Sequence, residues 1–252
     1  MKRHIPNLIT LLNVFSGCVA TVFAVQNQLG LAALFVFLGI FFDFFDGLAA
    51  RALNVKSDLG LQLDSLADVI TSGLVPGVVM YQLLSMAMTG GWNAGDYPDP
   101  GGSDIGMAIL ENPLPLLGFL ITLASAYRLA KFNIDENQTD SFIGLPTPAN
   151  ALLVLSLPLI LLYQNGDMMN EIILNQWFLI GLTFLSAYLL NANIKLFALK
   201  FKNWGFKDNA LRYGFIFVSL VLLVTLQFLA VPIIIGLYVL SSIVVNAQSE
   251  IR

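Results

Sequence analysis

The sequence carries very little charge, and this scarcity is the first constraint on the protein. Only 11% of the 252 residues are Asp, Glu, Lys or Arg, whereas 57% are hydrophobic. A soluble domain has about 25% charged residues, so this chain lacks the charge to cover a surface that faces water. We therefore expect a polytopic membrane protein. The net charge of −4 identifies no partner, and no nucleic acid is expected.

Cysteine and histidine are nearly absent as well. Cys18 is the only cysteine, which excludes an intrachain disulfide and leaves the redox compartment open. His4 is the only histidine, which argues against a zinc site and against a nucleophile triad built on histidine.

Long hydrophobic runs dominate what is present. Eight of them are predicted to span a membrane as helices, most being close to the ~20 residues that a span needs: residues 7–26, 30–50, 66–89, 113–132, 148–163, 176–194, 213–229 and 231–248. The basic start before the first run also resembles a signal peptide, but the seven further runs favour a first span. No internal repeat is visible, so we expect one all-α membrane helix bundle over residues 1–252.

The basic residues predict the orientation of this bundle. With eight spans, all 12 of them fall on one side of the membrane: Lys2, Arg3, Arg51, Lys56, Arg128, Lys131, Lys195, Lys200, Lys202, Lys207, Arg212 and Arg252. The connections on the opposite side contain none. The positive-inside rule then places both termini in the cytoplasm. The absence of a targeting extension fits a prokaryotic inner membrane.

Four aspartates flank the link between the second and third runs: Asp43, Asp46, Asp64 and Asp68. The first two share a helical face with Gly47 and Ala50, and the other two share one with Gly60 and Ser72. The link is short, so the two helices are expected to be antiparallel neighbours with opposed carboxylates. A fifth aspartate, Asp58, falls within the polar link, and no role is expected for it.

Four carboxylates in one pocket repel one another, so a cation is expected beside them. The candidates are Arg51, Lys56 and a metal ion. Oxygen ligands without histidine suit Mg²⁺ or Mn²⁺ better than zinc or copper, and four carboxylates can bridge two such ions. A structural polar cluster that holds two helices together is the alternative interpretation.

The four aspartates and the residues around them fill the pattern D-x2-D-G-x2-A-R-x8-G-x3-D-x3-D without a gap. Its members are Asp43, Asp46, Gly47, Ala50, Arg51, Gly60, Asp64 and Asp68. This stretch resembles the signature of the CDP-alcohol phosphotransferases. Three more stretches are similar to the branch formed by the bacterial-type CDP-diacylglycerol–serine O-phosphatidyltransferases: "PNLITLLNVFSG", "LDSLADVITSGLVPG" and "YRLAKFN" followed by "FIGLPTPANALL". The resemblance covers roughly residues 6–155.

The resemblance implies a chemistry and a set of roles. The reaction would join CDP-diacylglycerol and L-serine to give phosphatidylserine and CMP in the bilayer. Asp43, Asp46 and Asp64 would bind the metal, and Asp68 would lie at the metal site and act as the base. The pocket for CDP would be shaped by Gly47, Ala50, Arg51 and Gly60. A homodimer is a candidate assembly.

Other polar residues have two interpretations each. Arg128 and Lys131 either bind the acceptor carboxylate or a phosphate, or they are ordinary membrane anchors. Asn7, Thr10 and Asn13 share a face of the first helix and either line the pocket or serve capping and packing. The segment 195–212 is either an interfacial helix or a topology anchor. Pro76 is expected to kink the third helix, and Gly73 and Gly77 to allow close packing.

Two competing functions remain open at this stage. The same chemistry with glycerol phosphate, inositol phosphate or choline would call for extra cations in the pocket, which Arg128 and Lys131 could provide. A cation transporter would use the aspartates as an ion pathway, but it should carry polar residues through both leaflets. The other predicted spans are nearly free of charge.

Overall fold

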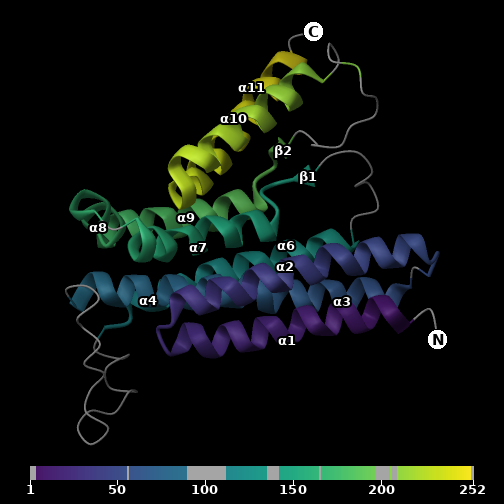
Figure 1. Ribbon diagram of the computed structural model, residues 1–252, viewed down its shortest axis with the longest axis horizontal. Helices are drawn as coiled ribbons and strands as arrows, with labels where there is room; N and C mark the ends of the chain where they lie inside the picture. The colour runs from purple at the N-terminus through teal and green to yellow at the C-terminus, as the bar shows by residue number, and fades with distance from the viewer. Residues whose placement is uncertain are drawn as a thin grey trace, which may run out of the picture.

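The computed structural model describes residues 4–55, 57–89, 112–134, 142–164, 166–196, 205 and 209–250, which form a helix bundle with one very small sheet (Figure 1). The helical elements are α1 (Ile5–Val25), α2 (Leu29–Ala52), α3 (Asp58–Asp68), the π-helix η2 (Val69–Leu74), α4 (Val75–Thr89), the 3-10 helix η4 (Leu114–Gly118), α6 (Phe119–Ile134), α7 (Thr147–Tyr163), α8 (Asp167–Ile173), α9 (Gln176–Asn191), α10 (Ala210–Leu226), the 3-10 helix η5 (Gln227–Leu229) and α11 (Ala230–Glu250). The strands β1 (Phe142–Ile143) and β2 (Lys195–Leu196) pair antiparallel.

The predicted all-α membrane bundle is confirmed, and each of the eight apolar runs coincides with helix. Four stretches are single spans that are long and apolar enough to cross a membrane: residues 5–25, 29–52, 58–88 and 114–134. A fifth such stretch, residues 212–246, contains both α10 and α11. The bent pair α8–α9 passes the same test as one unit, and α7 is apolar but only 17 residues long.

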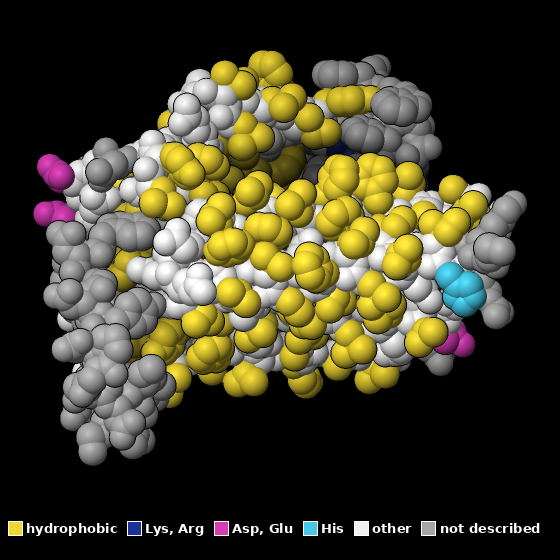
Figure 2. All heavy atoms as spheres, turned by 60° about the horizontal axis from the view of Figure 1, so that its bottom comes forward, with side chains coloured by type: hydrophobic (Ala, Val, Ile, Leu, Met, Phe, Trp, Pro, Cys, Tyr) yellow, Lys and Arg dark blue, Asp and Glu magenta, His cyan; other side chains and the backbone are white. Residues whose placement is uncertain are grey.

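The outer surface of the bundle is apolar, as a lipid-facing surface requires. On α1 and α2 the exposed side chains include Leu8, Phe15, Phe41 and Phe44. Figure 2 shows hydrophobic side chains spread along the length of one face, with the acidic side chains visible near its two ends. This distribution is the one expected of a bundle that lies across a bilayer.

Small residues form the tightest helix contact, between α1 and α2. Ala20 and Ala24 on α1 and Ala32 and Ala33 on α2 are fully buried. Because lipid tails are as apolar as leucine, helices in a bilayer associate through close packing, which small side chains permit. The same core continues into α4 and α7, where Val79, Leu83, Val154 and Leu155 are also fully buried.

Pro76 is expected to kink the third span. The structure has a π-helical segment just before this proline, within a continuous helical run. Proline lacks an N–H, and its ring crowds the carbonyl four residues earlier, which here belongs to Ser72. The wider π turn accommodates this, and Thr122 on α6 donates to the Gly73 carbonyl at 3.1 Å. The expected close packing at Gly77 is present, because a Cβ there would lie 2.1 Å from Thr122 Oγ1.

The chain runs back and forth, so that successive connections alternate between the two ends of the bundle. Figure 1 shows the N-terminus and the β1–β2 sheet toward the right, and the α1–α2 turn and α8 at the left. The α10–α11 hairpin reverses at Gln227, whose φ is 50°. Phe215 and Tyr238 face each other across it, with ring centroids 5.6 Å apart.

Two predicted connections differ in the structure. The expected outer loop 164–176 contains the short helix α8, and Asn175 then caps α9 by accepting from the N–H groups of Trp177 and Phe178. The segment 195–212, for which an interfacial helix is one of the two interpretations, begins as strand β2, and most of its remainder lies outside the described residues. The predicted outer loop 90–113 also lies almost entirely outside them.

The alternating arrangement makes the orientation testable. Reporter fusions after Asp167 and near Gly101 should read as external, and a fusion at Asn54, in the turn between α2 and α3, should read as cytoplasmic, because basic residues cluster on the Asn54 side. Paired alkaline phosphatase and fluorescent-protein fusions would measure this. A cytoplasmic signal at Asp167 would contradict the eight-span topology.

Candidate active site

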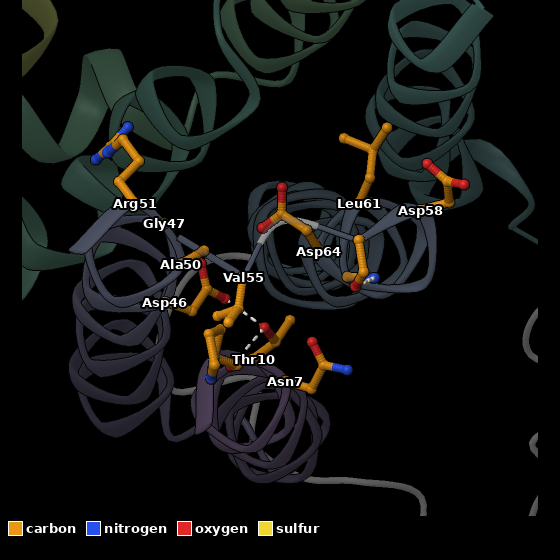
Figure 3. A pocket seen from close by; sticks show the side chains of 13 residues that line it. Asn7, Thr10, Asp46, Gly47, Ala50, Arg51, Val55, Asp58, Leu61 and Asp64 are labelled. Atoms are coloured by element: carbon orange, nitrogen blue, oxygen red, sulfur yellow. Dashed lines mark hydrogen bonds between the residues drawn. The ribbon is translucent and has the colours of Figure 1, made fainter. Parts of the chain in front are cut away.

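A cavity of about 420 Å³ opens between the ends of α1, α2 and α3. Figure 3 shows the three helices around it, with the labelled side chains reaching it from each of them. Its lining is Pro6, Asn7, Thr10, Asp46, Gly47, Ala50, Arg51, Val55, Ser57, Asp58, Gly60, Leu61 and Asp64. Helix α1 packs against both α2 and α3, whereas α2 and α3 make almost no direct backbone contact. The expected neighbours therefore face each other across a hollow that α1 holds open.

The aspartates converge beside this hollow: Asp46 and Asp64 line it, whereas Asp43 and Asp68 are not among the lining residues. Asp43, Asp46 and Asp64 each offer a carboxylate oxygen, and these oxygens all lie within 4.8 Å of one another. Asp46 is the most enclosed of them, with 6% of its surface exposed. Asp68, one turn beyond Asp64, is close enough to interact electrostatically with the other three. The spacing in the sequence predicted this meeting of two carboxylate pairs.

The fourth residue predicted for the face of Asp64 and Asp68 lies inside η2, where hydrogen bonds from i to i+5 wind the chain more loosely than an α-helix does. Ser72 is fully buried and does not line the cavity, and Asp68 is absent from the cavity lining as well. That Asp68 and Ser72 share a helical face therefore stays a prediction.

Thr10 is bound to the cluster directly. Its hydroxyl donates to Asp46 Oδ2 at 2.6 Å and also lies 3.1 Å from the carbonyl oxygen of Pro6. Asn7 lines the cavity one turn earlier on the same helix. Asn13, the third residue of this face, is fully buried below the cavity and does not line it.

The start of α3 adds residues that sequence reasoning missed. Ser57 is its N-cap and accepts from the Gly60 N–H at 3.1 Å. This cap turns the first residues of α3 toward the hollow, so Asp58, expected to have no role, lines the cavity. A helix N-terminus offers free N–H groups and a partial positive charge, which favour an anion. A serine before an amphipathic run is the signal that predicts such a cap.

The residues expected to shape the CDP pocket are all at the cavity. Gly47, Ala50, Arg51 and Gly60 belong to its lining. At Gly60 a Cβ would lie 3.2 Å from Ser57 Oγ and 3.3 Å from Asn7 Oδ1. Arg51 is exposed, and Figure 3 shows its guanidinium pointing away from Asp46 and Asp64. Lys56, the other cationic side chain considered, lies outside the described residues.

Arg128 and Lys131 are not among the residues that line the cavity. Arg128 Nη1 donates to the carbonyls of Ile143 at 2.7 Å and Leu190 at 2.9 Å, which ties α6 to the sheet and to the end of α9. Gly144 beside it has φ 72°, and a Cβ there would lie 2.6 Å from the Leu190 carbonyl oxygen. Lys131 is exposed. Arg128 Nη1 therefore has a structural role, because it holds α6 to the sheet and to the end of α9.

Thr147 is a further residue that the sequence did not single out. It begins α7, is 3% exposed, and its side chain contacts the Asp68 carboxylate. Its position is set by Pro146 and Pro148, which favour the extended entry and first turn of α7. The Pro-Thr-Pro sequence predicts a helix start here, but nothing local predicts that this start reaches Asp68.

Known proteins resemble this chain over most of its length. The model of the CDP-alcohol phosphatidyltransferase family matches residues 3–189. The CDP-diacylglycerol–serine O-phosphatidyltransferase of Helicobacter pylori (strain J99) is 34% identical over 241 residues, covering 95% of this chain and 89% of that protein. The protein of that name from Bacillus subtilis is 34% identical over 150 residues, which is 58% of this chain and 70% of the relative.

A more distant relative gives the same result. The CDP-diacylglycerol–serine O-phosphatidyltransferase of Methanocaldococcus jannaschii is 31% identical over 183 residues, covering 72% of this chain and 71% of the relative. The family match contains the whole cavity lining and all four aspartates. On this match and on the nearly full-length similarity to the H. pylori protein, the chain belongs to the CDP-alcohol phosphatidyltransferase family.

Proposed function

We propose that the protein transfers the phosphatidyl group of CDP-diacylglycerol to L-serine, giving phosphatidylserine and CMP. The observation that carries this proposal is the similarity to CDP-diacylglycerol–serine O-phosphatidyltransferases over 95% of the chain. The position of the cavity supports it, because the hollow is lined by the start of α1, the end of α2 and the start of α3, which lie together at one end of the bundle (Figure 1), beside apolar helix faces. There a water-soluble nucleotide and serine can meet a lipid whose acyl chains stay in the bilayer.

The carboxylate cluster fits a divalent metal. Three carboxylate oxygens within 4.8 Å of one another form an all-oxygen donor set, which suits Mg²⁺ or Mn²⁺. Arg51 points away from Asp46 and Asp64, so it does not neutralise them. We assign Asp43, Asp46 and Asp64 as ligands, with Asp68 completing a site for two ions. When bound, the metal would offset negative charge on the phosphate oxygens.

The side chains then divide the work. Asp68 takes the proton of the serine hydroxyl as its oxygen attacks the phosphorus that carries diacylglycerol. The bond from that phosphorus to the oxygen shared with CMP breaks, and CMP leaves with the bonding electrons. Thr10 holds Asp46 in place through its 2.6 Å hydrogen bond.

The remaining lining residues would bind CDP. Gly47, Ala50 and Gly60 leave room for the nucleotide, and the exposed Arg51 at the edge offers a forked donor for phosphate. Arg128 and Lys131 do not line this cavity, so we assign them the anchoring interpretation. This weakens the alternative acceptors that carry a phosphate, because such acceptors need extra cations near the attacking hydroxyl.

The acceptor is the first point to test. Purified protein with CDP-diacylglycerol and Mn²⁺ should release CMP with L-serine and at least ~10-fold more slowly with glycerol phosphate, inositol phosphate or choline. Chromatographic measurement of CMP and of the lipid product would decide it. Faster release with another alcohol would reassign the acceptor while leaving the family chemistry intact.

Metal removal tests the role of the cluster. Activity should vanish in EDTA and return on addition of Mg²⁺ or Mn²⁺, because the clustered carboxylates need a hard cation to bind phosphate. Zinc should restore little activity. Full turnover after exhaustive chelation and gel filtration would remove metal from the mechanism.

Substitution by Asn separates a base from a ligand, since Asn keeps the shape of Asp and loses its charge. Asp68→Asn should lower serine-dependent CMP release by at least ~10²-fold, the usual effect of losing a general base, while CDP binding is largely kept. Asp43→Asn should also weaken binding of CDP and Mn²⁺ in isothermal titration. Asp167→Asn, exposed in α8, is the control. Equal loss of binding in Asp68→Asn and Asp43→Asn would make Asp68 only a ligand.

A further inference from the structure

Directly below the carboxylate cluster, α1 and η2 are joined by one buried polar pair. Thr71 Oγ1 lies 2.7 Å from Asn13 Oδ1 and donates to it. Asn13 is fully buried, and Thr71 is 1% exposed. Because η2 begins at the residue after Asp68, this bond fixes the helix turn that follows that carboxylate.

Two glycines make room for this pair. A Cβ on Gly17 of α1 would lie 2.5 Å from Thr71 Oγ1, and one on Gly39 of α2 would lie 2.5 Å from Thr71 Cγ2. The second would also lie 2.8 Å from Asn13 Oδ1. Three segments of the chain thus converge on one threonine and one asparagine, with no space for a larger side chain. Such a fitted slot holds the pair in a single geometry.

The pair leaves one strong donor unused. Asn13 Nδ2 is buried and has no hydrogen-bond partner within the described part of the chain. The Asp68 carboxylate lies close enough to interact with this side chain, but Nδ2 makes no hydrogen bond to it in this structure. An ionised carboxylate only accepts hydrogen bonds, so the amide must present its NH₂ to it. If the Asn13 amide were flipped, its oxygen would face the carboxylate oxygen of Asp68. The Thr71 hydroxyl donates to Oδ1 and so favours the orientation in which Nδ2 faces Asp68.

We propose that Asn13 is a positioning residue for Asp68: its amide, oriented by Thr71, donates to one carboxylate oxygen and leaves the other toward the acceptor hydroxyl. This role rests on the proposed function, in which Asp68 receives the serine proton. Neither Asn13 nor Asp68 is among the residues that line the cavity, and Asn13 is fully buried, so the proposed role of Asn13 is to hold Asp68 and not to bind the nucleotide.

The test compares turnover with binding in the full-length protein. Asn13→Ala and Thr71→Val should each lower kcat for serine-dependent CMP release by about 10- to 100-fold, the range for a lost hydrogen bond to a charged group. The KM for CDP-diacylglycerol and the affinity for CDP with Mn²⁺ should stay within about threefold of wild type. Thr71→Ser, which keeps the hydroxyl, should restore most of kcat.

A buried threonine elsewhere provides the matched control. Thr183 is fully buried, and its hydroxyl donates to the Leu179 carbonyl of its own helix, so Thr183→Val makes the same change away from the cluster and should keep wild-type kcat. If Asn13→Ala fails to fold, the Thr71→Val and Thr71→Ser pair still decides. Unchanged kcat in Thr71→Val, or equal losses in Thr71→Val and Thr71→Ser, would overturn the proposal. Absence of serine-dependent CMP release from wild type would instead reject the proposed function.

Discussion

Mutual repulsion among carboxylates is the constraint on which the rest of this structure depends. Oxygens of Asp43, Asp46 and Asp64 lie within 4.8 Å of one another. At an effective dielectric constant of about 20, two unit charges at this separation repel by roughly 3 kcal/mol. Three such pairs approach the whole stability of a typical domain, about 5–15 kcal/mol. A cation at the cluster therefore matters for holding the carboxylates of α2 and α3 near one another as well as for the chemistry.

The fold supplies the framework that this cluster needs. Helix α1 packs on both α2 and α3, and it contributes Thr10 as a donor to the most enclosed carboxylate. The capped start of α3 turns N–H groups toward the same hollow. Both devices place partial positive charge near the carboxylates or their anionic substrate without adding a cationic side chain to the cavity lining.

The sequence predicted the parts of the site that follow from local spacing. The i, i+3 and i, i+4 intervals placed Asp43 with Asp46 and Asp64 with Asp68, and the short link brought the two pairs together. The sequence did not predict the π-helical segment η2, because a π turn leaves no periodic signal in one sequence. Nor did it place Thr147 beside Asp68 or Arg128 beside Leu190, since those contacts join residues 79 and 62 positions apart. Such contacts depend on how complete helices pack.

The cavity lining has a bearing on how the protein is made. Every residue that lines the hollow falls between Pro6 and Asp64, so a chain emerging from the ribosome carries the complete lining once its first quarter has been synthesised. The hairpin of α1 and α2, packed through Ala20, Ala24, Ala32 and Ala33, carries two of the four aspartates, and α3 carries the other two. Thr147, which lies close to Asp68, is synthesised 79 residues after it. The cavity lining is therefore present in the growing chain well before α7, the element that completes the surroundings of Asp68.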